Sequence, residues 1–247
     1  MTQNEVKLYV TQAADDAKTA NIAFLDNEIF EEHLIELFYD HSKDMVKKYQ
    51  NVPIRELIAA RHRDFYKKGE SWRVAAPKMD FPEWEKTSTI GYFTSPLKGV
   101  KFPFNESPRE LELMITGGAI SCKWGSNRVV AGMVIKAFEE GANAEFEQVC
   151  CFYRPLEETL RPVFEKVMTG KAKLSFNSPP NKATALLLTH DNGAWEFYLF
   201  GDKCHLISKG KSSFFKWLAT RKYIGGFEPI PKRMIERLLM THWDRYF

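Results

Sequence analysis

Three short apolar runs in the C-terminal half of the chain, separated by glycine-containing turns, constrain the fold most strongly. In order, the runs and turns are Ala183–His190, Asn192-Gly193, Trp195–Phe200, Gly201-Asp202 and Lys203–Ser208. Asparagine–glycine and glycine–aspartate pairs accept the positive φ angles that tight hairpin turns require. The sequence therefore predicts a three-strand antiparallel meander at residues 183–208.

A second hairpin is predicted around a pair of glycines in the middle of the chain. Apolar residues alternate on both sides of Gly117-Gly118, at Leu111, Leu113, Ile115, Ile120, Cys122 and Trp124. Alternation of this kind is typical of half-buried strands. The next run starts at Ser126 with apolar residues at helical spacing, which predicts a helix that Ser126 caps and Gly141 ends.

Helical spacing of apolar residues also predicts helices nearer both ends of the chain. The predicted ranges are Glu28–Tyr49, Pro53–Lys68, Ala144–Met168 with breaks near Pro155 and Pro162, Ser212–Lys222 and Lys232–Tyr246. In the helix at 212–222, we expect Phe214, Phe215 and Leu218 to form the buried side. Short strands are predicted at Trp72–Ala76 and Thr89–Phe93, and residues 171–182 are predicted to form a loop.

This order of elements indicates an α+β fold, because hairpins and helices follow one another without regular βαβ alternation. We expect a helical N-terminal part, antiparallel hairpins that include the meander, and a helical C-terminus. One domain is expected over residues 1–247. A mobile arm is predicted at residues 1–25, within which Ala13–Ala20 is predicted to form either a helix or part of that arm, and a seam is predicted near 177–182, where prolines and polar residues gather.

The motifs of several well-defined functional classes are absent from the chain. It contains no G-x-x-x-x-G-K-[ST] loop, no G-x-G-x-x-G fingerprint, no nucleophile elbow, no H-E-x-x-H helix and no C-x-x-C pair. An acidic stripe of His33, Glu36, Asp40 and Asp44 on the predicted helix is accounted for by a solvated face. We therefore expect no cofactor and no metal site. No stretch approaches the roughly 18 apolar residues of a membrane span, so we expect a cytoplasmic protein with no membrane partner.

One set of residues suggests acid–base catalysis. His190 and Asp191 lie at the first turn of the meander, and His205 lies in its third strand. Two imidazoles that face one pocket serve a hydrolase or transferase as general acid and base. The alternative is structural, since aspartate suits a turn and histidines near strand ends are commonly packed or solvated.

Basic residues interleaved with aromatic residues give the leading functional hypothesis. Cations neutralise phosphates, while aromatic faces stack on unpaired bases, so this mixture is typical of proteins that bind single-stranded nucleic acid, RNA or DNA. The predicted phosphate contacts are Arg61, Arg63, Lys67, Lys68, Arg73, Lys209, Lys211, Lys216, Arg221, Lys222, Arg233 and Arg237, and the predicted stacking residues are Trp72 and Tyr223. The binding is expected to be independent of base sequence.

The distribution of charge suggests contact between copies of the chain. Residues 1–50 contain 5 basic and 10 acidic side chains, whereas residues 201–247 contain 10 basic and 4 acidic ones. Opposite charge at two ends favours head-to-tail association, which would make nucleic-acid binding cooperative. A structural or adaptor protein is the third hypothesis. It predicts an exposed apolar patch, with Phe102–Phe104 or Tyr92-Phe93 as the candidate positions.

Overall fold

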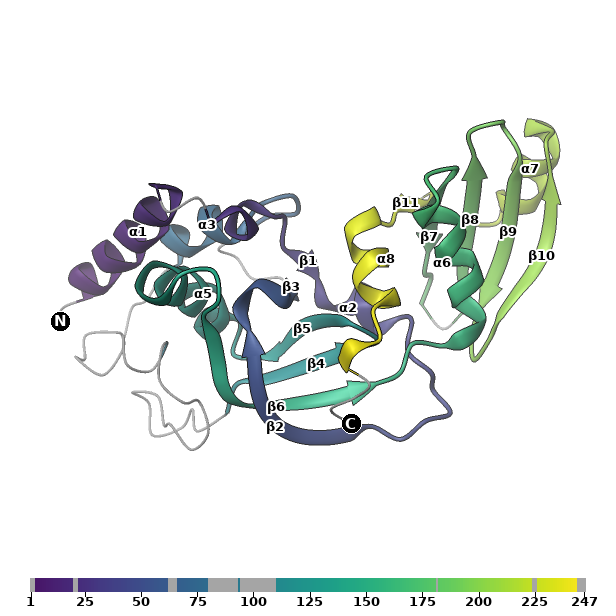
Figure 1. The fold of residues 1–247 in the computed structure, drawn as a ribbon. Helices are drawn as coiled ribbons and strands as arrows, with labels where there is room; N and C mark the ends of the chain where they lie inside the picture. Colours follow the sequence, from purple (N-terminus) through teal and green to yellow (C-terminus); the bar gives the residue numbers. More distant parts are fainter. Residues whose placement is uncertain are drawn as a thin grey trace.

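The computed structural model describes residues 3–19, 22–61, 66–79, 93, 110–180, 182–223 and 226–243. These residues form two β-sheets with helices packed on and between them, which confirms the predicted α+β class (Figure 1). Among the residues that the structure describes, no helix is both long enough and apolar enough to span a bilayer.

The first sheet has six strands and mixed direction. In spatial order they are β1 (Phe30–Glu31), β3 (Leu57–Ala60), β5 (Ala119–Trp124), β4 (Glu112–Thr116), β6 (Glu145–Arg154) and β2 (Val46–Pro53). The pairs β1–β3, β3–β5 and β4–β6 are parallel, whereas β4–β5 and β2–β6 are antiparallel. The predicted hairpin around the glycine pair is therefore confirmed as β4–β5.

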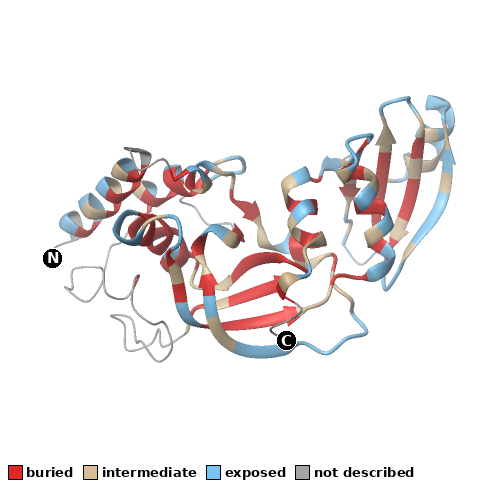
Figure 2. Cartoon of the chain, in the orientation of Figure 1, coloured by how far each residue is buried: buried red, intermediate tan, exposed pale blue. Residues whose placement is uncertain are grey.

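Helices cover one face of this sheet and enclose the larger core. They are α1 (Gln3–Thr19), α3 (Trp72–Ala75) and α5 (Ser126–Glu140), with the short 3-10 turns η1 (Ala23–Asp26), η2 (Ile54–Glu56) and η3 (Ala76–Lys78). The buried side of α1 packs in one apolar cluster with α5 and with alternate residues of the strands. Residues 13–19 are thus helical, which is the first of the two forms predicted there. Figure 2 shows this buried interior.

The second sheet has five antiparallel strands and contains the predicted meander. In spatial order they are β10 (Cys204–Gly210), β9 (Trp195–Phe200), β8 (Thr184–His190), β7 (Ala172–Asn177) and β11 (Glu228–Pro229). The meander of β8, β9 and β10 is confirmed. The stretch at 171–182, predicted to be a loop, is strand β7 as far as Asn177. This strand pairs with β8 along its whole length.

The remaining helices connect the two sheets. They are α2 (Glu32–Glu36), η4 (Glu158–Leu160), α6 (Arg161–Met168) and α8 (Lys232–Leu239), whereas α7 (Ser213–Thr220) packs on β9 and β10 of the second sheet alone. Apolar side chains of α2, α6 and α8 form one cluster with residues of both sheets. The glycine turn between β4 and β5 touches the end of α8, where a Cβ on Gly117 would lie 2.2 Å from the Leu238 carbonyl oxygen. The prediction of one domain stays a prediction.

Two predicted N-terminal helices are wrong. The range 28–49 contains β1, the five-residue α2 and the start of β2, and the range 53–68 contains η2 and β3. All four residues of β3 are buried between β1 and β5, and a fully buried strand has the same continuous apolar spacing as a buried helix. Strand β2 forms because it pairs with β6, about 100 residues further along the chain.

Other element predictions were wrong or incomplete for similar reasons. Residues 72–75 form helix α3 and not a strand, because the Ser71 side chain caps the amide of Val74. Residues 145–154 form β6, so only α6 remains of the helix predicted over 144–168. Helix α5 is confirmed, although Ser126 is its first residue and Gly125, at φ +93°, precedes it. The last helix, α8, ends at Leu239. Of the strand predicted at 89–93, only Phe93 lies within the described residues.

Candidate nucleic-acid interface

Helix α7 is oriented with its largest apolar side chains toward solvent. Phe214, Phe215, Trp217 and Leu218 are exposed by 62, 60, 56 and 40% respectively, and α7 contains no buried residue. The residues that are partly covered are Lys216, Ala219 and Thr220, at the spacing of one helix face. The prediction that Phe214, Phe215 and Leu218 bury this helix is therefore wrong.

The reason for this orientation lies in the sheet beneath the helix. A small cluster of Ala185, Leu187, Trp195 and Phe197 forms the outer face of the second sheet. The rings of Tyr223 and Phe227 already pack on Phe197, with centroid distances of 5.5 and 6.4 Å. Ala219 contributes to the same cluster, so α7 packs on the sheet through the helix face that carries this small side chain. The larger residues are left facing solvent.

Phe214 and Trp217 of α7, and Arg221 just after the helix, form a row of adjacent exposed side chains. The ring centroids of Phe214 and Trp217 lie 6.1 Å apart at an interplanar angle of 33°. The guanidinium carbon of Arg221 lies 5.7 Å from the centre of the Trp217 ring. Phe215 packs edge-on against Phe214 at 5.6 Å. The helix therefore presents adjacent aromatic faces with a cation at one end.

The segment that contains this row of side chains is predominantly basic. Residues 201–223 contain six Lys or Arg side chains and a single acidic residue, Asp202. Lys211, Arg221 and Lys222 are all exposed on or beside α7. Lys216 points toward the sheet, where its amine donates to the Thr189 hydroxyl at 3.4 Å. We call Phe214, Phe215, Trp217, Leu218, Lys211, Arg221 and Lys222 the α7 surface.

Two other residues predicted for this region lie apart from the α7 surface. Lys209 pairs in register with Glu196, so it points to the opposite face of the second sheet from α7. Tyr223 was a predicted stacking residue, but it packs against Phe197 and Phe227, and burial raises the pKa of its hydroxyl. Its ring face is thus engaged within the fold.

The basic cluster predicted at residues 61–73 is not one surface. Trp72 is completely buried, which leaves it no face for stacking. Arg73 is buried and bonded to Asp26, and Lys68 forms an ion pair with Glu228 at 2.6 Å. Arg61 and Lys67 are exposed, and Arg63 lies outside the described residues.

The two arginines predicted on the last helix also contact their own fold. Arg233 donates to the Glu28 carbonyl oxygen at 3.3 Å and lies over the Phe30 ring. Burial, together with the neighbouring charge of Arg237, lowers the pKa of Arg233. Arg237 lies 3.7 Å from the sulfur of Met240. Both side chains are half-buried, on a different element from α7.

The histidines proposed for acid–base catalysis lie on opposite faces of the second sheet. His190 contacts Glu196 at 2.9 Å on the face toward α6, where Lys166 also donates to Glu196 at 2.6 Å. His205 is paired with Leu199, whose side chain packs on the opposite, α7 side. The geometry does not bring the pair to one pocket, and Asp191 is exposed in the turn.

Glu196 is the most strongly perturbed carboxylate of the second sheet. Burial alone would raise its pKa, but hydrogen bonds from Lys166, Tyr198 and His190 outweigh burial and lower the pKa to about 2. The same arrangement raises the pKa of Tyr198, first through burial and then through its bond to the Glu196 carboxylate. This network fixes α6 to the sheet. Within the described ranges, no group of three or more metal-ligating side chains occurs.

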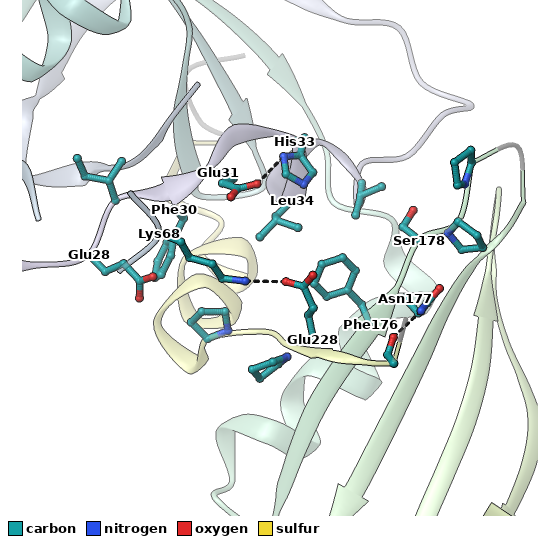
Figure 3. Close-up of a pocket in the computed structure, with 17 residues that line it drawn as sticks. Glu28, Phe30, Glu31, His33, Leu34, Lys68, Phe176, Asn177, Ser178 and Glu228 are labelled. Atoms are coloured by element: carbon teal, nitrogen blue, oxygen red, sulfur yellow. Dashed lines mark hydrogen bonds and ion pairs between the residues drawn. The ribbon is translucent and has the colours of Figure 1, made fainter. Parts of the chain in front are cut away.

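A cleft of about 710 Å³ opens between the two sheets (Figure 3). One wall comes from β1 and α2, and the other comes from β7, β11 and the loop after β7. Apolar residues, including Leu34, Leu37 and Phe176, line it together with four prolines. Carboxylates of Glu28 and Glu31 stand on one side, and the Lys68–Glu228 ion pair crosses it. We call this the acidic cleft.

Sequence reasoning found the cations of the α7 surface but missed its aromatic residues. An exposed apolar patch of the kind that the adaptor hypothesis predicts is present on α7. Of the positions predicted for such a patch, Phe93 is buried, and Tyr92 and Phe102–Phe104 lie outside the described residues. Comparisons with models of known protein families, with curated protein sequences and with solved structures found no significant match to this chain.

Proposed function

We propose that the protein binds single-stranded nucleic acid through the α7 surface, without preference for base sequence. The observation that carries this proposal is the exposed row of Phe214, Trp217 and Arg221. Unpaired bases stack on aromatic rings whatever their identity, because every base has a π face. A duplex hides these faces, which is why single strands are favoured over duplexes.

The surrounding cations supply the second half of the interaction. Lys211, Arg221 and Lys222 are exposed beside the aromatic residues, in a segment, residues 201–223, whose one acidic side chain is Asp202. Phosphate contacts release condensed counterions, so affinity falls as salt rises. Three contacts to a single strand correspond to a log–log slope of about −2.

The test is a titration of labelled oligothymidylate, followed by fluorescence anisotropy at several salt concentrations. Replacing Trp217 with Ala should weaken binding by roughly 5- to 150-fold, because stacking of one base contributes about 1–3 kcal/mol. Since Trp217 is more than half exposed, the free energy of unfolding should stay nearly unchanged. Replacing Arg221 and Lys222 together with Ala should make the salt slope less steep by about 1.4.

A matched control is an exposed aromatic residue far from α7. Phe138 on α5 is 37% exposed and packs against Tyr9. The Phe138→Ala variant should bind the oligonucleotide like the wild type. Absence of salt-dependent binding by the wild type, or equal losses in the Trp217 and Phe138 variants, would contradict the proposal. If the wild type shows no salt-dependent binding, the α7 surface would instead support the adaptor hypothesis, in which a protein partner covers this surface.

A further inference from the structure

The α7 surface and the acidic cleft have complementary chemistry. The α7 surface combines four large apolar side chains with the cations Lys211, Arg221 and Lys222. The acidic cleft combines an apolar, proline-rich lining with carboxylates at its sides. Exposed apolar patches with a charged rim commonly mark sites of association. Opposite charges on two such surfaces favour their mutual docking.

The cleft already holds one cation from the chain itself. The Lys68 amine reaches across to Glu228, and Figure 3 shows Glu28 and Glu31 on the wall from which Lys68 extends. The bond to Glu228 raises the pKa of Lys68, and the charges of Glu31 and Glu28 act in the same direction. A positive group is therefore favoured at this position, and Glu28 and Glu31 line the cleft beside it, where the Glu31 carboxylate lies 3.2 Å from His33 Nδ1 (Figure 3).

The two surfaces cannot meet within one molecule. Helix α7 lies against β9 and β10, whereas the cleft is lined by β7 and β11 at the other edge of the same sheet. Four strand spacings separate β10 from β11, or about 19 Å. Figure 1 shows α7 at the far end of the molecule and β11 beside the junction of the sheets. Docking therefore requires a second copy of the chain.

We propose that the α7 surface of one copy docks in the acidic cleft of another, forming a head-to-tail assembly. Because the two contact surfaces differ, two joined copies retain one free helix and one free cleft between them, and the interface is heterologous. Phe214 and Trp217 enter the apolar part of the cleft, and the cations beside them face Glu28, Glu31 and Glu228. Such a contact produces chains or closed rings and not symmetric dimers.

This assembly regulates the site of the proposed function, and only this regulatory step rests on that function. A helix docked in a neighbour's cleft has its aromatic faces covered, so it cannot stack on bases. Single-stranded nucleic acid and the cleft therefore compete for the same surface. Addition of nucleic acid releases individual copies from the assembly, and removal of nucleic acid restores it.

The test uses sedimentation velocity on the full chain with two variants that disable one surface each. The helix variant carries Arg221→Glu and Lys222→Glu, which leaves the cleft intact. The cleft variant carries Glu228→Lys, and Ser178→Arg, in the loop after β7 on the same wall, is a second cleft variant that leaves the Lys68–Glu228 pair in place. Glu147→Lys, at an exposed position of β6, is the matched charge control.

At low salt, the average mass of the wild type and of the control should exceed the chain mass of 28.6 kDa, and it should rise with protein concentration. Each variant alone should remain at the chain mass. An equimolar mixture of helix and cleft variants should form a species of twice that mass, because one supplies an intact helix and the other an intact cleft. A wild type that stays monomeric, a cleft variant that assembles like the wild type, or a mixture that stays monomeric would overturn the proposal.

Oligothymidylate separates the two proposals. If the assembly forms but the oligonucleotide neither binds nor dissociates it, the docking holds and the proposed function fails. If the oligonucleotide binds and the wild type is monomeric without it, the proposed function holds and the docking fails. When both hold, the oligonucleotide reduces the mass of the wild-type assembly to single copies, and both cleft variants bind it at least as tightly as the wild type.

Discussion

Replacing Arg73 with Ala should destabilise the fold without weakening nucleic-acid binding. The Arg73 side chain is only 5% exposed and joins three segments. Its Nε and Nη2 atoms donate to the two carboxylate oxygens of Asp26 at 2.7 and 3.1 Å, and its Nη1 atom donates to the Ala14 carbonyl oxygen at 2.6 Å. It thereby fastens α3 to the last turns of α1 and to η1.

The magnitude follows from what the substitution leaves behind. Removing one partner of a buried ion pair costs about 3–5 kcal/mol when the remaining charge is also buried. Asp26 is 60% exposed, so its carboxylate stays solvated and that cost is only partly incurred. The buried carbonyl groups of Ala14, Ala17 and Ile22 each lose a donor, and this loss and the space left by the side chain still destabilise the fold. We expect a loss of about 3 kcal/mol.

Urea unfolding followed by tryptophan fluorescence measures this loss, and oligothymidylate anisotropy measures binding below the unfolding transition. The matched variant is Arg221→Ala, whose side chain is exposed. It should unfold within about 0.5 kcal/mol of the wild type but bind more weakly. The reasoning is refuted if the Arg73 variant is as stable as the wild type, or if it loses binding while the Arg221 variant retains it.

Two further predictions concern stability. Gly117→Ala should lower the free energy of unfolding in urea by more than about 2 kcal/mol, because φ is +56° and the new Cβ would lie 2.2 Å from the Leu238 carbonyl oxygen. Gly193→Ala, where φ is +80° but no atom lies within 4 Å of the new Cβ, should lower it by about 1 kcal/mol. Equal losses in the two variants would contradict this packing. Glu196 has a folded-state pKa below its unfolded value, so its stabilisation is present above pH of about 4.3 and is lost as pH falls toward 2. Between those pH values the wild type should lose on the order of 2 kcal/mol more than Glu196→Gln, and parallel pH profiles would contradict the network.

The parts of the fold that local signals determine were predicted well. The turns at Asn192-Gly193 and Gly201-Asp202 specify which strands become neighbours, so the meander was predictable. Strands β2 and β3 depend instead on partners far along the chain. Their apolar spacing also fits a helix, and no local residue distinguishes the two structures.

The candidate site was predictable in its charges but not in its aromatic residues. The sequence indicates which residues of 213–220 share a helix face, but not which face meets the sheet. That choice depends on Tyr223 and Phe227, which fill the outer face of the sheet first. Trp72 and Arg73 are the opposite case, because they were predicted at the surface and are buried. An aromatic residue next to a cation looks the same in the sequence whether the pair is exposed or buried.

Hydrogen–deuterium exchange of the cleft variant Glu228→Lys, with and without oligothymidylate, shows where single-stranded nucleic acid binds. The variant is chosen because it is expected to be monomeric, so that changes report nucleic acid alone. We expect slower exchange in peptides that cover residues 211–223, with little change in α1, α3 and α5. Unchanged exchange in α7, with protection elsewhere or with none, would contradict the claim that the α7 surface binds single-stranded nucleic acid.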